Sequence, residues 1–592
     1  MTATDEHGRK ATEEHGKTPI RTVFIRVHPW RSPWLLIFGV ALALRLIGLR
    51  YGLPAVYNPD EVAIMSRALA FAKGDLNPHN FLYPTFYFYA LFAWEGLTAI
   101  AAVAVRAVDS FGAFQREFFL DPTRVFVAGR LLTALLGAAT AVATAVLGTR
   151  LAPRFGVHPR AGLIAGLIVA VSPLHVLNSH YVKHDVPVTF VVVLAYLAYE
   201  RLFLPPRGGS RIQLIAAAAI TGIAFSTHYY AIFLAIPLAW SAVRGAANPS
   251  DAVKRVAIAA IVSGAVFFLL SPFILVEPAT ALRDIRANRQ IVVDRAAEQL
   301  GYVAGALRYG RLLLFDTVGL PASLAAIAGL LVAARRNPAG TVWLLAFPLP
   351  FLLFIASTYP ASRYLVPVVP FIACFAAVAI ASLRARDRVA MVVLGLVLLP
   401  AATECWRTVT FIRHTDTRTL ALEFIRSRLP DGATVLTQPY SVPLEPTAAS
   451  LREAVERSGQ PMPTKTRLQL ERSPYPSPAY RLVYIGFGLD VDKLYLPPEQ
   501  LSGNDPLAAA RREHVAFVVL KRYNDEAPAT MPFLAALARE GRRLAVFSPY
   551  AGAGRGSGTP QAEPFLHNTD ARITAALERP GPVVEIWQLA GR

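Results

Sequence analysis

Charged residues are scarce in this chain of 592 residues, because Asp, Glu, Lys and Arg together make up only 17%. A soluble protein of this length carries about a quarter charged residues. Hydrophobic residues make up 54% of the chain, the mean hydropathy is +0.41, and the apolar residues gather in repeated long runs. Runs of roughly 18 residues or more can cross a bilayer. The composition therefore predicts a polytopic α-helical membrane protein.

Cysteines are also nearly absent. Cys374 and Cys405 are the only two, and both lie inside or at the edge of apolar runs. They form neither a metal-binding spacing nor a disulfide framework, so they do not indicate a redox compartment. There is no internal repeat of the kind expected for a solenoid or for the matched halves of a transporter. No small-residue cleavage site follows the first apolar run, which we therefore expect to be retained as a helix.

The net charge of +19 is typical of nucleic-acid-binding proteins, but its distribution favours another interpretation. Lys and Arg cluster in short loops between apolar runs, which is the orientation signal of membrane proteins. A nucleic-acid-binding protein would instead show a basic face with aromatic platforms on a soluble domain. We therefore expect membrane lipids, and no nucleic acid, among the partners.

Apolar segments and basic loops together predict the topology. The candidate spans are 32–50, 83–105, 125–148, 161–178, 186–204, 212–227, 229–243, 256–276, 311–334, 341–358, 364–383 and 389–406. The basic N-terminus, 1–31, places the end of the first helix outside. The later basic loops all lie on the cytoplasmic side only if the segment 83–105 does not cross the membrane. The aromatic residues at the start of this segment suit the headgroup layer. We therefore predict eleven transmembrane helices and a juxtamembrane or re-entrant helix; the alternative is one ordinary crossing that breaks the charge rule.

The composition changes after residue 406, and this divides the chain into three parts. We predict a cytoplasmic N-terminal tail (1–31), a transmembrane domain (32–406) and a soluble extracytoplasmic α/β domain (407–592). In the last part, short β-rich runs alternate with polar, Pro-rich and Ala-rich segments. The strand candidates are 433–438, 481–487, 515–521 and 583–589.

Two adjacent acids, Asp60 and Glu61, follow the first apolar run. Pro59 stiffens the approach to them, an amphipathic segment (62–74) follows, and the predicted topology places both acids outside. Partial burial moves the pKa of a carboxyl group toward neutrality, so such an acid can act as a general base toward a hydroxyl or amine. The simpler interpretation is that acids at a helix exit are solvated.

A second polar cluster is predicted on the same face of the membrane. His180, Lys183, His184 and Asp185 lie between two apolar helices, where charged groups are costly. A metal site built from His180, His184 and Asp185 is one interpretation. No matching ligand set occurs elsewhere, so we favour substrate binding and predict no metal site.

Arginines form two further candidate binding sites on the predicted outer face of the membrane. Arg283, Arg286 and Arg289 have helical spacing and suit a phospholipid headgroup or a lipid-linked phosphate, because arginine binds phosphate in bidentate geometry. An amphipathic helix at the interface explains them equally well. Arg363 and Tyr364 begin an apolar helix and face the same predicted cavity, although an arginine at a helix mouth can simply snorkel.

These motifs, taken in order, resemble the GT-C glycosyltransferases, specifically the branch with the lipid A aminoarabinose transferase and the protein O-mannosyltransferases. The similar segments are NPDE (58–61), GDLNPHNFLYP (74–84), VAGRLLTALLG (127–137), SHYVKHDVP (179–187), ASRYLVPVVPF (361–371) and TRTLALEFIRSRLPDGATV (417–435). Each motif alone is nonspecific, and the specificity lies in the ordered set.

The resemblance implies a GT-C fold and an enzyme that takes a sugar from a polyprenyl-phosphate carrier on the outer face of the membrane, usually with inversion. Asp60, with Glu61 beside it, matches the acid that acts as base or orients the acceptor. Asp185 matches the acid of the second external loop. The scheme requires no cofactor, although the sequence leaves a divalent cation open. The acceptor, a cell-envelope lipid, glycan or protein, is not indicated.

The chain departs from the aminoarabinose enzymes at one position. They have a lysine before the proline of the second segment, where this chain has Tyr83. If that lysine meets the carrier phosphate, another cation must replace it; the candidates are Lys183, His79 and the Arg283–Arg289 cluster. The alternative functions are a lipid or sugar transporter or flippase, and a non-catalytic scaffold of the cell (inner or plasma) membrane.

Overall fold

The computed structural model describes residues 33–203, 209–294, 301–383, 387–488, 490–522, 531–551, 573 and 576–589. The predicted N-terminal tail, 1–31, and parts of the predicted basic loops near 207 and 384–386 lie outside these residues.

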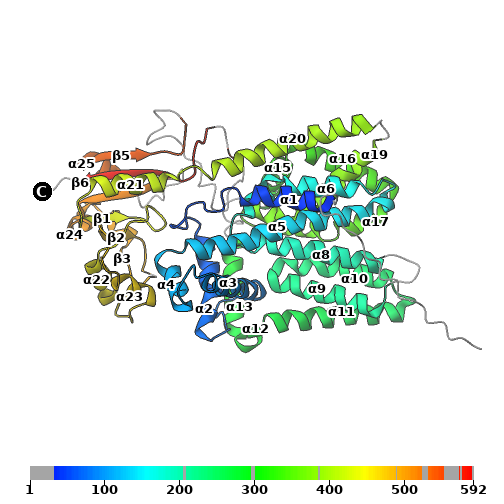
Figure 1. Ribbon diagram of the computed structural model, residues 1–592, viewed down its shortest axis with the longest axis horizontal. Coiled ribbons are helices and arrows are strands. Elements are labelled where there is room, and N and C mark those ends of the chain that lie inside the picture. Colours follow the sequence, from blue (N-terminus) through cyan, green and yellow to red (C-terminus); the bar gives the residue numbers. More distant parts are fainter. Residues whose placement is uncertain are drawn as a thin grey trace, which may run out of the picture.

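Apolar helices form a bundle whose long members run side by side (Figure 1). The bundle contains α1 (Pro33–Leu46), α5 (Thr123–Leu151), α6 (Ala161–Ala170), α8 (Asp185–Phe203), α9 (Arg211–Thr227), α10 (Ala235–Arg244), α11 (Pro249–Leu270), α16 (Leu320–Arg336), α17 (Pro338–Leu345), α18 (Pro348–Ile355), α19 (Val369–Ser382) and α20 (Asp387–Phe411). Small residues bring neighbours close: a Cβ added at Gly148 of α5 would lie 3.0 Å from the Cα of Gly162.

The helices identify the chain as a multi-pass membrane protein, as predicted. Among the described residues, six helices are long and apolar enough to span a membrane, or up to eight if each of two bent pairs counts as one span. Four shorter apolar helices accompany them. The span that ends in α19 is central, with 83% of its residues buried, whereas α11 is peripheral, with 11% buried. The count of eleven spans remains a prediction.

Three predicted spans are broken in the structure. The segment 161–178 divides into α6 and α7 (Pro173–Asn178), because Ser172 caps a new helix that begins at Pro173. The segment 311–334 bends by 103° between α15 (Tyr302–Phe315) and α16, and 341–358 bends by 43° before Pro348. Proline at the first turn of each new helix explains why an apolar run does not stay one helix.

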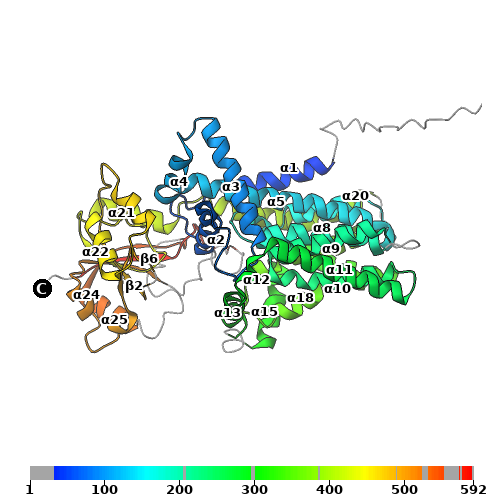
Figure 2. The same ribbon diagram turned by 90° about the horizontal axis from the view of Figure 1, so that it is seen from below.

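Short helices and loops gather at one end of the bundle, beside the C-terminal domain (Figures 1 and 2). They include α2 (Pro59–Ala70), α4 (Phe111–Leu120), α12 (Phe273–Val276) and α13 (Pro278–Arg289), together with the longer α3 (Phe86–Ala104). The helix α3 runs across the direction of the long helices, since Figure 1 shows it nearly end-on and Figure 2 shows it steeply inclined. This orientation fits the predicted juxtamembrane helix, although α3 is also long enough to cross.

The C-terminal part forms a six-stranded sheet of order β3-β2-β1-β4-β6-β5. The first four strands in this order are parallel, and β6 and β5 are antiparallel to their neighbours. The strands are β1 (Thr434–Thr437), β2 (Arg481–Ile485), β3 (Leu494–Leu496), β4 (Phe517–Arg522), β5 (Gly541–Phe547) and β6 (Val583–Leu589); the helices are α21 (Thr417–Arg428), α22 (Ala448–Ser458), α23 (Thr464–Leu470), α24 (Ala508–Arg512) and α25 (Met531–Glu540).

Helices cover both faces of this sheet. Val435 packs with Ile425 of α21 on one face, and Leu436 packs with Phe533 of α25 on the other. Strands buried on both faces read as apolar runs, which is why β1, β2, β4 and β6 coincide with the predicted strands. The predicted boundary at 406 falls inside α20, which continues to Phe411.

Candidate active site

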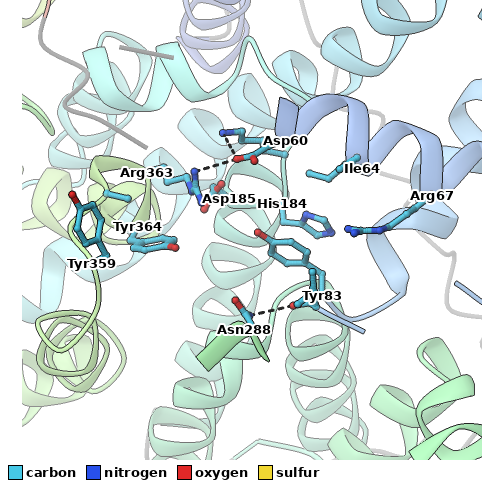
Figure 3. A pocket seen from close by; sticks show the side chains of 14 residues that line it. Asp60, Ile64, Arg67, Tyr83, His184, Asp185, Asn288, Tyr359, Arg363 and Tyr364 are labelled. Atoms are coloured by element: carbon cyan, nitrogen blue, oxygen red, sulfur yellow. Dashed lines mark hydrogen bonds and ion pairs between the residues drawn. The ribbon is translucent and has the colours of Figure 1, made fainter. Parts of the chain in front are cut away.

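A charged cavity of about 290 Å³ lies where α2 begins (Figure 3), and α2 lies at the same end of the bundle as the sheet (Figure 1). Its lining side chains are Asp60, Ala63, Ile64, Arg67, Leu82, Tyr83, Lys183, His184, Asp185, Asn288, Tyr359, Ala361, Arg363 and Tyr364. The structure therefore brings together both predicted acids of the two loops and several of the predicted cations.

Asp60 lies between two cations. Its Oδ2 accepts from Lys183 Nζ at 3.0 Å and from Arg363 NH1 at 3.2 Å. The Asp60 side chain is 40% exposed, whereas Lys183 and Arg363 are 6% and 13% exposed. The carboxylate therefore stays open to the cavity while its counter-charges are buried behind it.

The start of α2 determines where Asp60 points. Asn58 caps the helix by accepting from the backbone N–H of Asp60, and Pro59 occupies the first turn. An acid in this turn is stabilised by the helix dipole. Because Asp60, Ile64 and Arg67 recur at helical spacing, one face of α2 supplies both the carboxylate and a cation to the cavity.

Lys183 and Asp185 come from the loop that leads into α8. Asp185 is the first residue of α8, is 5% exposed, and lies beside Arg363 (Figure 3). Burial lowers the pKa of Lys183, while the nearby Asp60 carboxylate opposes this shift. The loop thus contributes one group of each charge to the same wall of the cavity.

Glu61 does not line the cavity. Its side chain is buried and forms a two-point ion pair with Arg130, with distances of 2.9 Å to Nε and 2.8 Å to NH2. Its Oε1 also accepts from the backbone N–H of Val182. Glu61 therefore connects α2, α5 and the loop that carries Lys183, and it positions this loop.

The two predicted histidines occupy different environments. His180 lies away from the cavity, and both its ring nitrogens bond backbone carbonyls, those of Val176 and Ile47 at 2.8 Å each. His184 lines the cavity and stacks on Tyr83, with ring centroids 4.3 Å apart. Burial lowers the pKa of both imidazoles, and the two carbonyl oxygens beside His180 oppose this shift at that residue. His184 therefore adds no positive charge to the cavity at neutral pH.

The other predicted cations lie outside the cavity. His79 is exposed and bonds Asp75 at 2.9 Å and Glu277 at 2.8 Å. Arg283 and Arg286 are exposed on α13, whereas Arg289 lies at the edge of a neighbouring cavity. Among the described residues, no group of three His, Cys, Asp or Glu side chains is arranged to hold a metal ion.

The sequence did not single out Arg67, Asn288, Tyr359 or Arg130. Arg67 had a usable signal, because it lies two helical turns beyond Asp60 in the amphipathic segment 62–74. Its guanidinium reaches toward His184 (Figure 3), and we find no hydrogen bond or ion pair that it makes to another described residue. Asn288 and Arg130 come from distant elements, and spacing alone gives no signal for them.

A second cavity of about 520 Å³ adjoins the charged one and is mostly apolar. The two cavities share Tyr83, Asn288 and Tyr364. The remaining wall is largely aromatic and aliphatic, with Tyr229, Tyr230, Ile232, Phe233, Ile285, Phe351, Phe354 and Ile355. A site of this form can hold an amphiphile, with its charged end in one cavity and its apolar end in the other.

The fold and the site thus define an integral membrane protein with a combined polar and apolar site at one end of its helix bundle. Residues 107–277 match the family described as dolichyl-phosphate-mannose-protein mannosyltransferase. This match confirms the predicted resemblance. The matched range includes Lys183 and Asp185 and leaves out Asp60 and Arg363.

Solved structures similar to this chain include ArnT from Cupriavidus metallidurans bound to undecaprenyl phosphate. That comparison has 15% identity and a TM-score of 0.46, and it covers 94% of this chain and 98% of ArnT. The archaeal oligosaccharyltransferase AglB from Archaeoglobus fulgidus has 12% identity and a TM-score of 0.44, with 87% of this chain and 73% of AglB covered. No curated protein sequence matches the chain.

Proposed function

We propose that this chain is a membrane glycosyltransferase that moves a sugar from a polyprenyl-phosphate carrier to an acceptor on the outer face of the membrane. The observation that carries the proposal is the charged cavity, where Asp60 and Asp185 meet Lys183 and Arg363 beside an apolar cavity. A sugar linked through phosphate to a long lipid is an amphiphile of matching form.

The charge of the cavity suits a departing phosphate. Three cations, Arg67, Lys183 and Arg363, face two carboxylates, Asp60 and Asp185, so the cavity carries a net positive charge. When the sugar leaves, the carrier phosphate changes from a diester to a monoester and gains negative charge. Preorganised cations that meet such developing charge lower the barrier. Among the described residues we find no ion pair to Arg67, whose interaction with the Asp284 carboxylate acts only beyond ion-pair distance. We therefore assign Arg67 to the phosphate, in place of the lysine that Tyr83 replaces.

Asp60 is the carboxylate that an acceptor can reach. In the proposed step, the acceptor oxygen bonds the anomeric carbon from the face opposite the phosphate, and the bond from carbon to phosphate oxygen breaks. The phosphate leaves with the electron pair, and the acceptor proton passes to Asp60. A glycosyl phosphate already has a good leaving group, so this step needs only modest assistance from a base. We assign the buried Asp185 to orienting Lys183 and Arg363.

The membrane orientation and the roles of the apolar cavity and the C-terminal domain complete the proposal. We place the cavity and the C-terminal domain on the extracytoplasmic face, as the basic loops predict, with eleven crossings and α3 at the interface. The apolar cavity takes the first part of the carrier lipid. The C-terminal domain stands over the same end of the bundle and is the candidate for covering the acceptor site (Figure 2).

The decisive experiment incubates the purified protein with a panel of radiolabelled polyprenyl-phosphate sugars and a membrane extract as acceptor. We expect one sugar to be consumed and its label to appear in acceptor material. An arm with EDTA tests whether a divalent cation contributes, and we expect activity to persist because the cations of the chain itself serve the phosphate. Consumption of none of the panel, combined with donor-independent lipid or sugar movement in liposomes, would instead establish a transporter.

A further inference from the structure

A third cavity, of about 460 Å³, lies where α1 and α20 end, and it shares no lining residue with the charged cavity. We call it the α1–α20 groove. One wall comes from Leu46, the last residue of α1, and from residues of 48–53. The other comes from residues of 412–416, which follow α20, and from Thr419 of α21. On the proposed orientation, the groove lies at headgroup depth on the outer face of the membrane.

Two arginines give the groove its charge. Arg50 and Arg413 are exposed, and neither makes an ion pair that we find with a described residue. The acid in the groove, Asp416, is already neutralised, because its carboxylate pairs with Arg418 at 2.8 Å and accepts from Tyr51. The groove therefore presents an excess of two positive charges. The rule that collects cations on the cytoplasmic side does not explain them at this end of the bundle.

Apolar surface leads into the groove from the bundle side. Leu36 and Leu46 of α1 are 66% and 41% exposed, and Leu399 and Trp406 of α20 are 64% and 54% exposed. In Figure 1, α20 runs along the edge of the bundle and α1 lies beside it. Such side chains face acyl chains in a bilayer, and Trp is typical of the headgroup layer. The surface thus offers a basic end above an apolar strip.

The walls of the groove are fixed in place. Gly48 has a φ of +83°, and a Cβ at this position would lie 2.7 Å from Cγ1 of Ile412, so the Ile412 side chain packs directly on the backbone of Gly48. His414 Nδ1 lies 2.7 Å from the carbonyl oxygen of Glu578 in the C-terminal domain. Tyr57, three residues before Asp60, bonds Thr419 at 2.8 Å. The groove is therefore a preformed site that touches the loop leading to α2.

We infer that the α1–α20 groove binds the headgroup of an anionic phospholipid of the outer leaflet, with Arg50 and Arg413 on its phosphate. Two guanidinium groups suit the oxygens of a phosphate, and the apolar strip suits its acyl chains. This inference does not depend on the proposed transferase activity, because it concerns lipid bound at a separate cavity.

The test measures lipids retained by the purified protein in native mass spectrometry, after exchange into mixed micelles of phosphatidylglycerol and phosphatidylcholine. We expect wild type to retain phosphatidylglycerol preferentially. The double variant Arg50→Gln/Arg413→Gln should lower this preference about thirtyfold, since each of the two cations near an anionic headgroup contributes about 1 kcal/mol and about 1.4 kcal/mol corresponds to a factor of ten. The matched control is Arg308→Gln/Arg311→Gln, which removes two exposed arginines outside the groove.

Three outcomes would overturn the inference. In the first, the preference for phosphatidylglycerol survives in the variant Arg50→Gln/Arg413→Gln. In the second, the control variant loses this preference to the same extent, which would mean that general surface charge causes it. Alternatively, inorganic phosphate at millimolar concentration displaces the lipid, in which case the groove is a site for small anions. Sugar-transfer activity is recorded separately, so failure of this inference leaves the proposed function untouched.

Discussion

Asp60 and Glu61 are adjacent in the chain and face opposite environments. Neighbours on a helix point about 100° apart, so Asp60 faces the cavity while Glu61 faces the protein interior and Arg130. The sequence identified the pair but could not separate the two roles, because both residues fit the same motif. Only the partner of Glu61, which comes from a distant helix, distinguishes them.

Replacing Asp60 with Asn should remove the proposed base while keeping the size and hydrogen-bonding capacity of the side chain. We expect sugar transfer to fall by a factor of about 10² to 10⁴, the usual contribution of a positioned base. Transfer of labelled sugar by purified variants checks this, with Asp109→Asn as an exposed acid outside the cavity. Full activity in Asp60→Asn would eliminate the base assignment.

Replacing Glu61 with Gln should act on stability. The change leaves Arg130 charged and buried without its carboxylate, and breaking such pairs costs about 3–5 kcal/mol. We expect a large drop in the thermal midpoint in detergent. Glu117→Gln, which breaks an exposed pair with Arg124, should change the midpoint little, since exposed pairs contribute about 0–1 kcal/mol. Equal shifts in both variants would contradict the positioning role.

At the scale of elements, α2 combines a carboxylate and a cation on one face. The amphipathic segment 62–74 was visible in the sequence, and helical spacing from Asp60 would have indicated Arg67. The break at 171–172 and the bend between α15 and α16 could not be predicted from the sequence. Apolar periodicity does not reveal them, because both halves of a broken helix remain apolar.

Arg67 on α2 gives a test of the phosphate assignment. Arg67→Gln should raise KM for the donor and also lower kcat, because Arg67 would meet charge that grows during the reaction. Arg67→Lys keeps the charge and should restore part of the activity. Steady-state kinetics with the cognate donor measure both effects. Unchanged donor kinetics in Arg67→Gln would mean that Lys183 and Arg363 alone bind the phosphate.

The loop before α3 carries a pH-sensitive contact. Hydrogen bonds to Asp75 and then to Glu277 raise the pKa of His79 above its ordinary value of 6.5. The charged contact is therefore complete below about pH 6.5 and is lost as pH rises through the raised pKa. We expect hydrogen exchange in 75–84, corrected for intrinsic rates, to increase over that range. His79→Gln should abolish the pH step while leaving exchange in α5 unchanged.

For the whole molecule, the junction between the membrane domain and the sheet is a compact cluster. Arg418 pairs with Asp416 and lies 3.7 Å above the ring of Tyr57, whose hydroxyl bonds Thr419. Composition predicted two domains and several strands. It could not predict this cluster, because contacts between segments hundreds of residues apart leave no periodic pattern. It also missed β3, which has only three residues, and the edge strand β5, which is not fully buried.

Arg418→Ala should loosen the junction. It leaves Asp416 buried without its ion pair, and such a loss costs about 3–5 kcal/mol. We expect limited proteolysis to cut near 411–417 faster and to release the C-terminal domain. Arg426→Ala, at an exposed position of α21, is the matched control and should resist cleavage as wild type does. Unchanged protection in Arg418→Ala would show that other contacts hold the domains together.

Three side chains, Tyr83, Asn288 and Tyr364, line both the charged and the apolar cavity and so mark the boundary between them. If the carrier lies across this boundary, the protein itself fixes the height of the scissile bond above the bilayer. Only the first few isoprene units of the carrier then touch the protein. The remaining tail would then dissolve in lipid, so turnover should depend little on how many further units the carrier has.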